Sequence, residues 1–190
     1  TDYCVMPQPT AALVFDTVKP VKTERRGNTL FLDFGSTYVG YLRVSACGQA
    51  GSCVTVRCGQ ELNADGTVRY RLRANCVYEE PWLLSGNADT LDWFDYKSFR
   101  YAELLLPEGC VIQSVELSAR HYPFSLSAHM LPAYAGEEPL RRVWELCVHS
   151  QHYGVQEVIQ DCMEREKGFY VGDGCYTALA NMLLTGDDSI

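Results

Sequence analysis

The chain has 190 residues, of which 47% are hydrophobic and 12% aromatic, so it can bury the core of one large or two small domains. Its formal net charge of −8 argues against a nucleic-acid or anionic-membrane partner, because such partners require clustered Lys and Arg. No apolar run approaches the ~20 residues of a membrane span, and residues 1–4 have neither a basic start nor an apolar signal core. We therefore expect a soluble chain without a targeting segment.

The nine cysteines form an odd set without a CxxC pair and without the paired histidine spacing of a zinc site. Neither a metal nor another cofactor is predicted. Scattered single cysteines are typical of small buried residues in a reducing compartment, so a cytoplasmic location is expected. Cys47 and Cys53 would bridge a hairpin only if the protein were exported. The full set is Cys4, Cys47, Cys53, Cys58, Cys76, Cys110, Cys147, Cys162 and Cys175.

Short alternating segments dominate residues 1–122. Residues 1–27 contain several prolines and are predicted to be an irregular lead-in with room for one edge strand. Farther on, Tyr41 and Arg43 alternate with Leu42 and Val44, which is the pattern of a half-buried strand. No helical pattern separates the segments, so an antiparallel, jelly-roll-like β-sandwich domain is predicted over 1–122. Its expected strands are 29–34, 38–46, 53–58, 67–72, 89–94, 98–106 and 111–122.

Residues 123–136 are predicted to be a linker, because Pro123, Pro132 and Gly136 interrupt any long element. One last strand is expected within it, over 124–128.

Residues 137–190 change to a helical period. Apolar residues three and four positions apart predict a helix over 138–153, and a second helix is predicted over 174–184 before Gly186. The two helices form a separate, smaller domain in this prediction. The apolar face of the first helix is expected to dock on the sandwich or on a second copy, giving a homo-oligomer. That face contains Leu140, Val143, Trp144 and Cys147.

The segment between the two helices, residues 160–173, concentrates acids, bases and aromatic residues. Several carboxylates in one place, with cations between them, can keep one acid protonated while another is ionised, as acid catalysis at an acetal requires. The same run also fits a solvated helix cap.

Four groups of residues follow one another along the chain. They are Leu32-Asp33-Phe34-Gly35 with Val39-Gly40-Tyr41-Leu42-Arg43-Val44, then Glu61-Leu62 with Asp65-Gly66-Thr67, then Phe99-Arg100-Tyr101, and finally Asp161-Cys162-x-x-Arg165-Glu166-Lys167 with Tyr170-x-Gly172-Asp173. In this order they resemble bacterial α-L-rhamnosidases of glycoside hydrolase family 78. The last group is similar to the signature at the start of the catalytic barrel in that family.

The resemblance implies an inverting hydrolysis of terminal α-L-rhamnosyl residues, with rhamnose-containing glycans or glycosides as partners and an (α/α)6 catalytic barrel. It makes Glu166 the general acid that protonates the leaving oxygen. Asp161 and Asp173 would bind rhamnose hydroxyls, Arg165 would bind hydroxyls or orient a carboxylate, and Tyr170 would offer an aromatic surface to the sugar. Met163 stands where the family usually has proline, which would loosen this loop.

An inverting enzyme also needs a carboxylate base, ~6.5–9.5 Å from the acid. The resemblance places this base much later in the barrel, and twelve barrel helices need on the order of 300 further residues. We therefore expect residues 1–190 to be a fragment that is inactive alone.

Two other functions stay open. Trp82 and Trp93 would stack on sugars if the sandwich were a carbohydrate-binding module, or would pack in the core if it were only a scaffold. His149 and His152 lie three residues apart on the first predicted helix, but without a third ligand nearby they are interpreted as surface or interface residues rather than as metal ligands.

Overall fold

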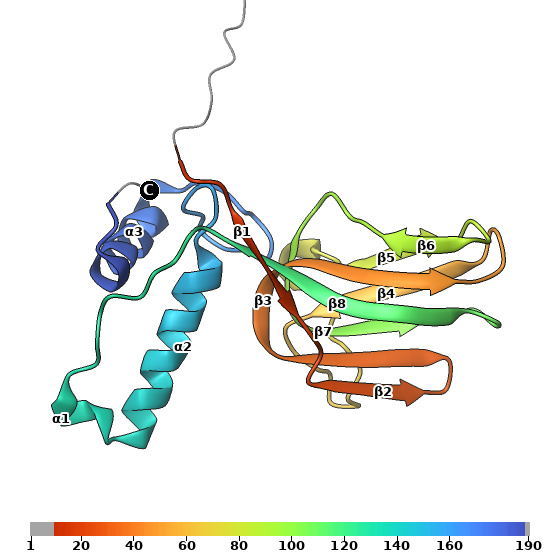
Figure 1. Ribbon diagram of the computed structural model, residues 1–190, viewed down its shortest axis with the longest axis horizontal. Coiled ribbons are helices and arrows are strands. Elements are labelled where there is room, and N and C mark those ends of the chain that lie inside the picture. Colours follow the sequence, from red (N-terminus) through yellow and green to blue (C-terminus); the bar gives the residue numbers. More distant parts are fainter. Residues whose placement is uncertain (1–9, 189–190) are drawn as a thin grey trace, which may run out of the picture. The chain divides into compact units, whose positions relative to one another are not determined.

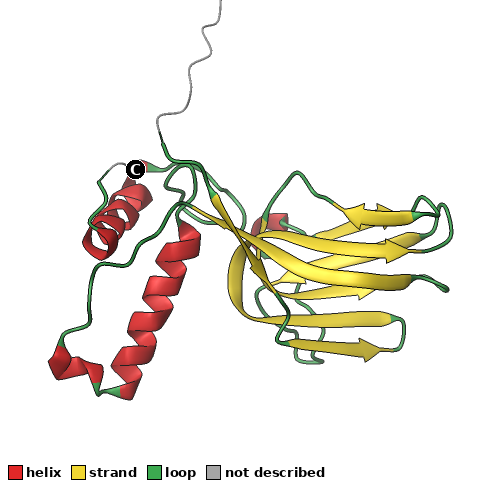
Figure 2. Ribbon diagram, in the orientation of Figure 1, coloured by secondary structure: helices red, strands yellow, loops and turns green. Residues whose placement is uncertain are grey.

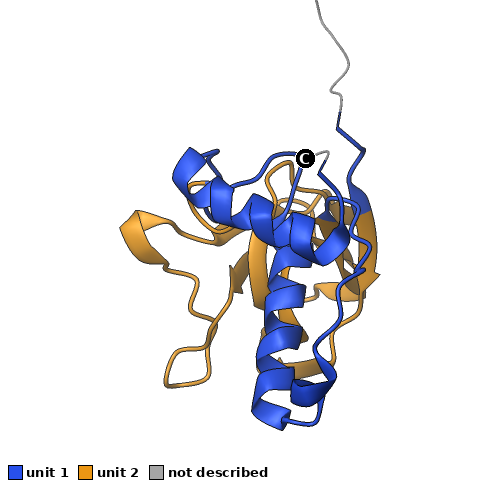
Figure 3. Cartoon of the chain, turned by 90° about the vertical axis from the view of Figure 1, so that its left-hand side faces the viewer, with its two compact units in different colours: residues 1–14, 121–162, 167–190 blue, residues 15–120, 163–166 orange. Residues whose placement is uncertain are grey.

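The computed structural model describes residues 10–188 and divides into two compact units, shown in Figure 3. Unit 1 comprises residues 1–14, 121–162 and 167–190, and unit 2 comprises residues 15–120 and 163–166. The expectations about the N-terminal residues 1–4, including Cys4, lie outside the described residues.

Unit 2 is built from antiparallel strands, as Figures 1 and 2 show. An eight-stranded sheet has the order β1-β8-β3-β7-β4-β5, and β2 and β6 also pair with β3. The predicted fold class, a mainly β antiparallel sandwich followed by helices, is confirmed. The strands are β1 (Val14–Val18), β2 (Lys22–Arg26), β3 (Thr29–Cys47), β4 (Cys53–Gly59), β5 (Glu79–Leu83), β6 (Ala88–Leu91), β7 (Lys97–Leu105) and β8 (Val111–His121).

The long strand β3 changes its neighbours along its length. Its first part pairs with β2 and β7, whereas its second part pairs with β8 and β6. The pairing with β7 shifts register between Asp33 and Tyr38, and such a bulge bends a strand so that it can pass from one layer of a sandwich to the other. The predicted separation into strands 29–34 and 38–46 is therefore wrong, because the ladder resumes after the bulge.

The bulge in β3 is fastened by the carboxylate of Asp33. Arg100 on β7 donates two hydrogen bonds to it, from Nε to Oδ1 at 2.8 Å and from Nη2 to Oδ2 at 2.9 Å. The backbone N–H of Gly35 donates to the same carboxylate at 2.7 Å. Gly35 has a φ of +85°, which glycine adopts without steric cost. Two of the motifs read from the sequence therefore meet here.

The core of unit 2 lies on both sides of this bend. Phe34 meets Phe99 edge to face, with 5.9 Å between ring centroids. A Cβ atom on Gly40 would lie 2.1 Å from the carbonyl oxygen of Ser118, so only glycine lets β3 and β8 approach this closely. Other fully buried side chains of unit 2 are Leu32, Leu42, Val44, Val54, Val56, Leu104 and Leu117.

Residues 67–72 do not form the predicted strand. This segment makes only isolated bridges, between Leu62 and Val68 and between Arg71 and Val77. It follows a tight turn in which the carboxylate of Asp65 accepts hydrogen bonds from the backbone N–H and the hydroxyl of Thr67. Hydrogen bonds from a side chain to nearby backbone groups compete with the backbone pairing of a sheet. The bonds of Asp65 therefore favour a turn over a continuous strand at this point.

Other strand predictions also differ from the structure, and β5 lies where no strand was predicted. The described part of the lead-in, residues 10–27, holds two strands rather than one, because β2 pairs with β3 from Lys22 to Arg26. The strand expected over 89–94 ends at Leu91. Residues 124–128 form no strand, and the backbone N–H groups of Ser127 and Ala128 instead donate to the carbonyl of Leu184.

The helices belong to unit 1. They are α1 (Pro132–Ala135), α2 (Glu138–Gly154) and α3 (Val171–Thr185), with a 3₁₀ turn (Arg73–Asn75) in unit 2. The two predicted helices are confirmed, although α3 begins three residues earlier than expected. α2 and α3 are joined by a hydrogen bond from Nε2 of Gln151 to the carbonyl of Thr177, 3.0 Å long. Among the described residues, no helix has both the length and the apolar character needed to cross a bilayer.

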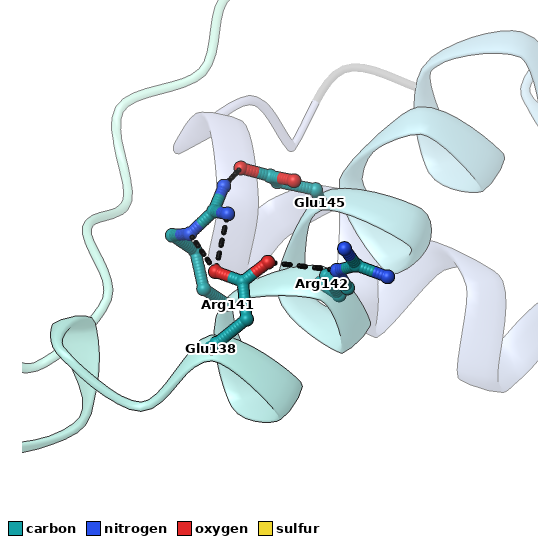
Figure 4. Close-up of polar contacts among 4 residues, drawn as sticks. All are labelled: Glu138, Arg141, Arg142 and Glu145. Carbon is teal, nitrogen blue, oxygen red and sulfur yellow. Dashed lines mark hydrogen bonds and ion pairs between the residues drawn. The ribbon is translucent and has the colours of Figure 1, made fainter.

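One face of α2 is charged, as Figure 4 shows. Glu138 accepts hydrogen bonds from Arg142, at 2.8 Å, and from Arg141, which also contacts Glu145. The bonds from Arg142 and Arg141 hold the pKa of Glu138 below its usual value. The opposite face is apolar and exposed, and with Met130 and Tyr134 it lines a groove of about 380 Å³. α2 is therefore amphipathic, as its sequence period predicts.

The described cysteines are free thiols, and their burial varies. Cys58 is fully buried, and burial raises its pKa to about 12, in line with the expected structural role. Cys53, Cys147 and Cys175 are exposed, which contradicts the expectation that the cysteines are buried.

We predict that Asp33→Asn lowers the free energy of unfolding by about 2 kcal/mol at pH 7, because the charged acceptor of two Arg100 bonds is lost. The bonds from Arg100 hold the pKa of Asp33 below its usual value, so this contribution is complete above pH ~3.9 and disappears as the pH falls through the lower folded-state pKa. Urea unfolding at pH 7, 4 and 2.5 measures both effects.

The matched control is Arg100→Lys, which keeps the charge but cannot donate a fork of two bonds, and we expect an intermediate loss. An Asp33→Asn variant as stable as the parent at pH 7 would show that the bulge is held by other contacts.

Candidate active site

The five residues predicted for the site lie in the segment between α2 and α3 and in the first turn of α3. Arg165 and Glu166 belong to unit 2, whereas Asp161, Tyr170 and Asp173 belong to unit 1. Their convergence on one sugar stays a prediction.

Asp161 closes a loop with Gly168. The backbone N–H of Asp161 donates to the carbonyl of Gly168, and the N–H of Gly168 donates back to Oδ1 of Asp161, each at 2.9 Å. A Cβ atom on Gly168 would lie 2.6 Å from the ring of Tyr170, so glycine leaves room for that ring. Lys167 has a φ of +53°, which reverses the chain just before Gly168. Asp161 is thus held in place by two hydrogen bonds with the backbone of Gly168.

Tyr170 and Asp173 lie at the start of α3. Tyr170 is the N-cap residue, its carbonyl accepts from the N–H of Gly174, and its side chain is 53% exposed. Asp173 lies in the first turn and is exposed. A carboxylate at this end is stabilised by the positive end of the helix dipole. Both side chains are accessible to a ligand.

Glu166 forms an ion pair with its neighbour Arg165, with 2.5 Å between Nη1 and Oε1. The two side chains are 40% and 38% exposed, so water reaches the pair. Just before them, the backbone carbonyl of Glu164 accepts a hydrogen bond from the hydroxyl of Tyr78. Tyr78 is buried, and its burial raises the pKa of its hydroxyl, so it acts as a neutral donor at physiological pH. This bond fastens residues 163–166 within unit 2.

Sequence reasoning missed Tyr78 and Gly168. Tyr78 is 86 residues away from Glu164 in the chain, and nothing in the pattern around it indicates that contact. The sequence could have indicated the role of Gly168. A glycine that follows a charged run and precedes two aromatic residues is typical of a position where the chain reverses direction.

The other candidate residues from the sequence are two histidines on α2 and two tryptophans in unit 2. The ring of His152 stacks on Phe124 at 4.8 Å and on Tyr153 at 4.4 Å, and it meets the ring of His121 edge to face. His149 lies beside Tyr153 as well. Trp82 is half-buried on β5, whereas Trp93 follows β6 and lines a surface groove of unit 2. Trp82 does not line that groove, so the two tryptophans do not form one sugar-stacking surface there.

Comparison with known proteins points to one family. Residues 23–117 match the family model described as the bacterial α-L-rhamnosidase concanavalin-like domain. An α-L-rhamnosidase from Streptomyces avermitilis is 30% identical over 84 residues, which are 43% of this chain and 8% of that protein.

Solved structures show the same fold. The rhamnosidase from Klebsiella oxytoca with rhamnose bound has a TM-score of 0.76 and 17% identity, and the match covers 94% of this chain and 42% of that one. The GH78 family rhamnosidase of Bacillus sp. GL1 has a TM-score of 0.74 and 17% identity over 85% of this chain and 17% of that one. The Streptomyces avermitilis α-L-rhamnosidase complexed with L-rhamnose has a TM-score of 0.68 and 23% identity over 85% of this chain and 16% of that one. The chain spans less than half the length of each of these relatives.

We predict that Asp161→Ala speeds amide hydrogen exchange of Gly168 by about tenfold, because a loop bond worth ~1.4 kcal/mol is lost. Exchange in α2 should not change. Asp161→Asn is the matched control, since its amide oxygen can still accept the bond, and it should leave the Gly168 rate within about threefold of the parent. Equal rates in Asp161→Ala and the parent, measured by NMR, would contradict the role given to this carboxylate.

Proposed function

This chain belongs to the family of the bacterial α-L-rhamnosidase concanavalin-like domain, and from this membership we propose that it serves a glycosidase that removes terminal α-L-rhamnose from glycans or glycosides. The observation that carries the proposal is the matched sandwich, followed in the chain by the acidic loop of residues 161–173. The fold likeness to rhamnosidase structures supports it.

The proposed mechanism is an inverting hydrolysis. Glu166 protonates the glycosidic oxygen while water attacks the anomeric carbon from the opposite face, activated by a carboxylate base ~6.5–9.5 Å from the acid. Asp161 and Asp173 accept hydrogen bonds from rhamnose hydroxyls, and Tyr170 stacks on the apolar face of the sugar. This base is proposed to lie outside the 190 residues.

The ion pair between Arg165 and Glu166 sets a condition on this mechanism. A general acid must contact the glycosidic oxygen, whereas in the structure the carboxylate of Glu166 contacts the guanidinium of Arg165. The proposed role therefore requires Arg165 to turn from Glu166 towards sugar hydroxyls when the glycoside binds. Its exposed position makes such a movement inexpensive.

We predict that Glu166→Gln, in the complete product of the gene, lowers kcat on an alkyl α-L-rhamnoside by about 10³-fold. The loss should be at least tenfold smaller on 4-nitrophenyl α-L-rhamnoside, because a nitrophenolate leaves without needing a proton. NMR of the first product should show β-L-rhamnose. Residues 1–190 alone should give no turnover.

Glu164→Gln is the matched control, since Glu164 lies in the same loop and uses its backbone carbonyl, rather than its side chain, in the bond to Tyr78. It should keep activity within about threefold of the parent. Equal losses for both variants, or an α-L-rhamnose first product, would refute the proposed mechanism. Turnover by residues 1–190 alone would refute the location of the base.

We also propose that the exposed apolar face of α2 associates with a second copy of the chain. Val143 is 56% exposed at the centre of this face, so a charge there should not harm the monomer. Light scattering should find a dimer of residues 1–190, and Val143→Glu should convert it to a monomer with unchanged circular dichroism. A parent chain that is already monomeric at high concentration would refute this association.

A further inference from the structure

A groove of about 450 Å³ lies on the surface of unit 2. None of the residues that line it belongs to the acidic loop. Four of its six lining residues are aromatic, and the other two carry opposite charges. Its size falls within the ~300–1,000 Å³ range of small-ligand sites. The lining residues are Phe15, Tyr41, Arg43, Asp92, Trp93 and Phe94.

The sheet brings these residues together from β1, from β3 and from the loop that follows β6. Tyr41 and Arg43 alternate along β3 with the buried Leu42 and Val44, so they share the outward face. β6 pairs with the same part of β3, with Leu91 opposite Val44, so the loop that follows Leu91 runs beside Arg43. Phe15 comes from β1, and its ring stacks on Tyr41 with 6.5 Å between centroids.

Two buried cations hold the aromatic rings in place. Arg120, 7% exposed, donates from Nη1 to the hydroxyl of Tyr41 at 3.1 Å. Lys97, 3% exposed, lies with its Nζ 4.2 Å from the ring centroid of Trp93 and is paired with Glu80 at 2.9 Å. A binding surface whose side chains are fixed before the ligand arrives loses less entropy on binding.

The remaining aromatic surface is open to solvent. Phe94 is fully exposed and Phe15 is 55% exposed. Exposed aromatic rings gathered in one groove mark a binding site more often than single exposed residues do.

From this arrangement we propose that the groove binds one neutral pyranose residue of a glycan. The apolar C–H face of a pyranose suits a flat aromatic wall, and its hydroxyls need both a donor and an acceptor. Arg43 supplies the donors and Asp92 the acceptors. Their charges balance, which favours a neutral ligand over a charged one. The site would hold glycan on the sandwich, and it does not depend on the catalytic role of Glu166.

The test uses residues 1–190 and three probes at up to ~20 mM: the methyl glycosides of α-L-rhamnose, β-D-glucose and β-D-galactose. Saturation-transfer NMR should detect binding of at least one probe. Phe94→Ala should raise its Kd by about tenfold or more, because one stacking wall is lost. Arg43→Ala should weaken binding by a similar factor through the lost donors.

Leu83→Ala is the matched control, since Leu83 is 68% exposed in the same unit and does not line the groove. Leu83→Ala and Glu166→Gln should both leave the Kd unchanged. The inference is overturned if none of the three probes binds, if binding survives Phe94→Ala, or if Leu83→Ala weakens it equally. Binding lost only in Glu166→Gln would overturn it too, while placing the sugar at the proposed active site.

Discussion

The sandwich depends on the ion pair between Asp33 and Arg100, which holds the bulge where β3 changes its neighbours. The carboxylate of Asp33 is only 15% exposed and accepts three hydrogen bonds, two from Arg100 and one from Gly35. Without this compensation a buried carboxylate would be costly. With it, one strand serves both layers, and the core around Phe34 forms on the two sides of the bend.

This arrangement also decides which surface of unit 2 can bind a ligand. Once β3 has turned, Tyr41 and Arg43 face outward beside the loop that follows β6. Buried Arg120 donates a hydrogen bond to the hydroxyl of Tyr41, and buried Lys97 lies against the ring of Trp93. Both cations also have partners outside the groove, since Lys97 is paired with Glu80 and Arg120 lies over the ring of Tyr96.

The acidic loop is organised differently, by its own backbone. Asp161 and Gly168 close it with reciprocal bonds, and the hydroxyl of Tyr78 fastens the carbonyl of Glu164. The side chains of Glu166, Tyr170 and Asp173 stay exposed, as groups that are to meet a substrate must be. The proposed role of this loop comes from its resemblance to the family signature, whereas exposed carboxylates alone would equally suit a solvated cap.

The sequence by itself determined the β class and the two long helices, because periods of two and of 3.6 residues are local properties that survive without knowledge of the partners. It also determined the family, through ordered motifs whose residues include Asp33, Arg100 and Glu166. Only the tertiary structure decided that 29–47 is one strand and that 67–72 is not a strand, since pairing requires a neighbour that local pattern does not reveal. The groove was hidden for the same reason: Phe15, Tyr41 and Phe94 are far apart in the chain, and sheet register brings them together.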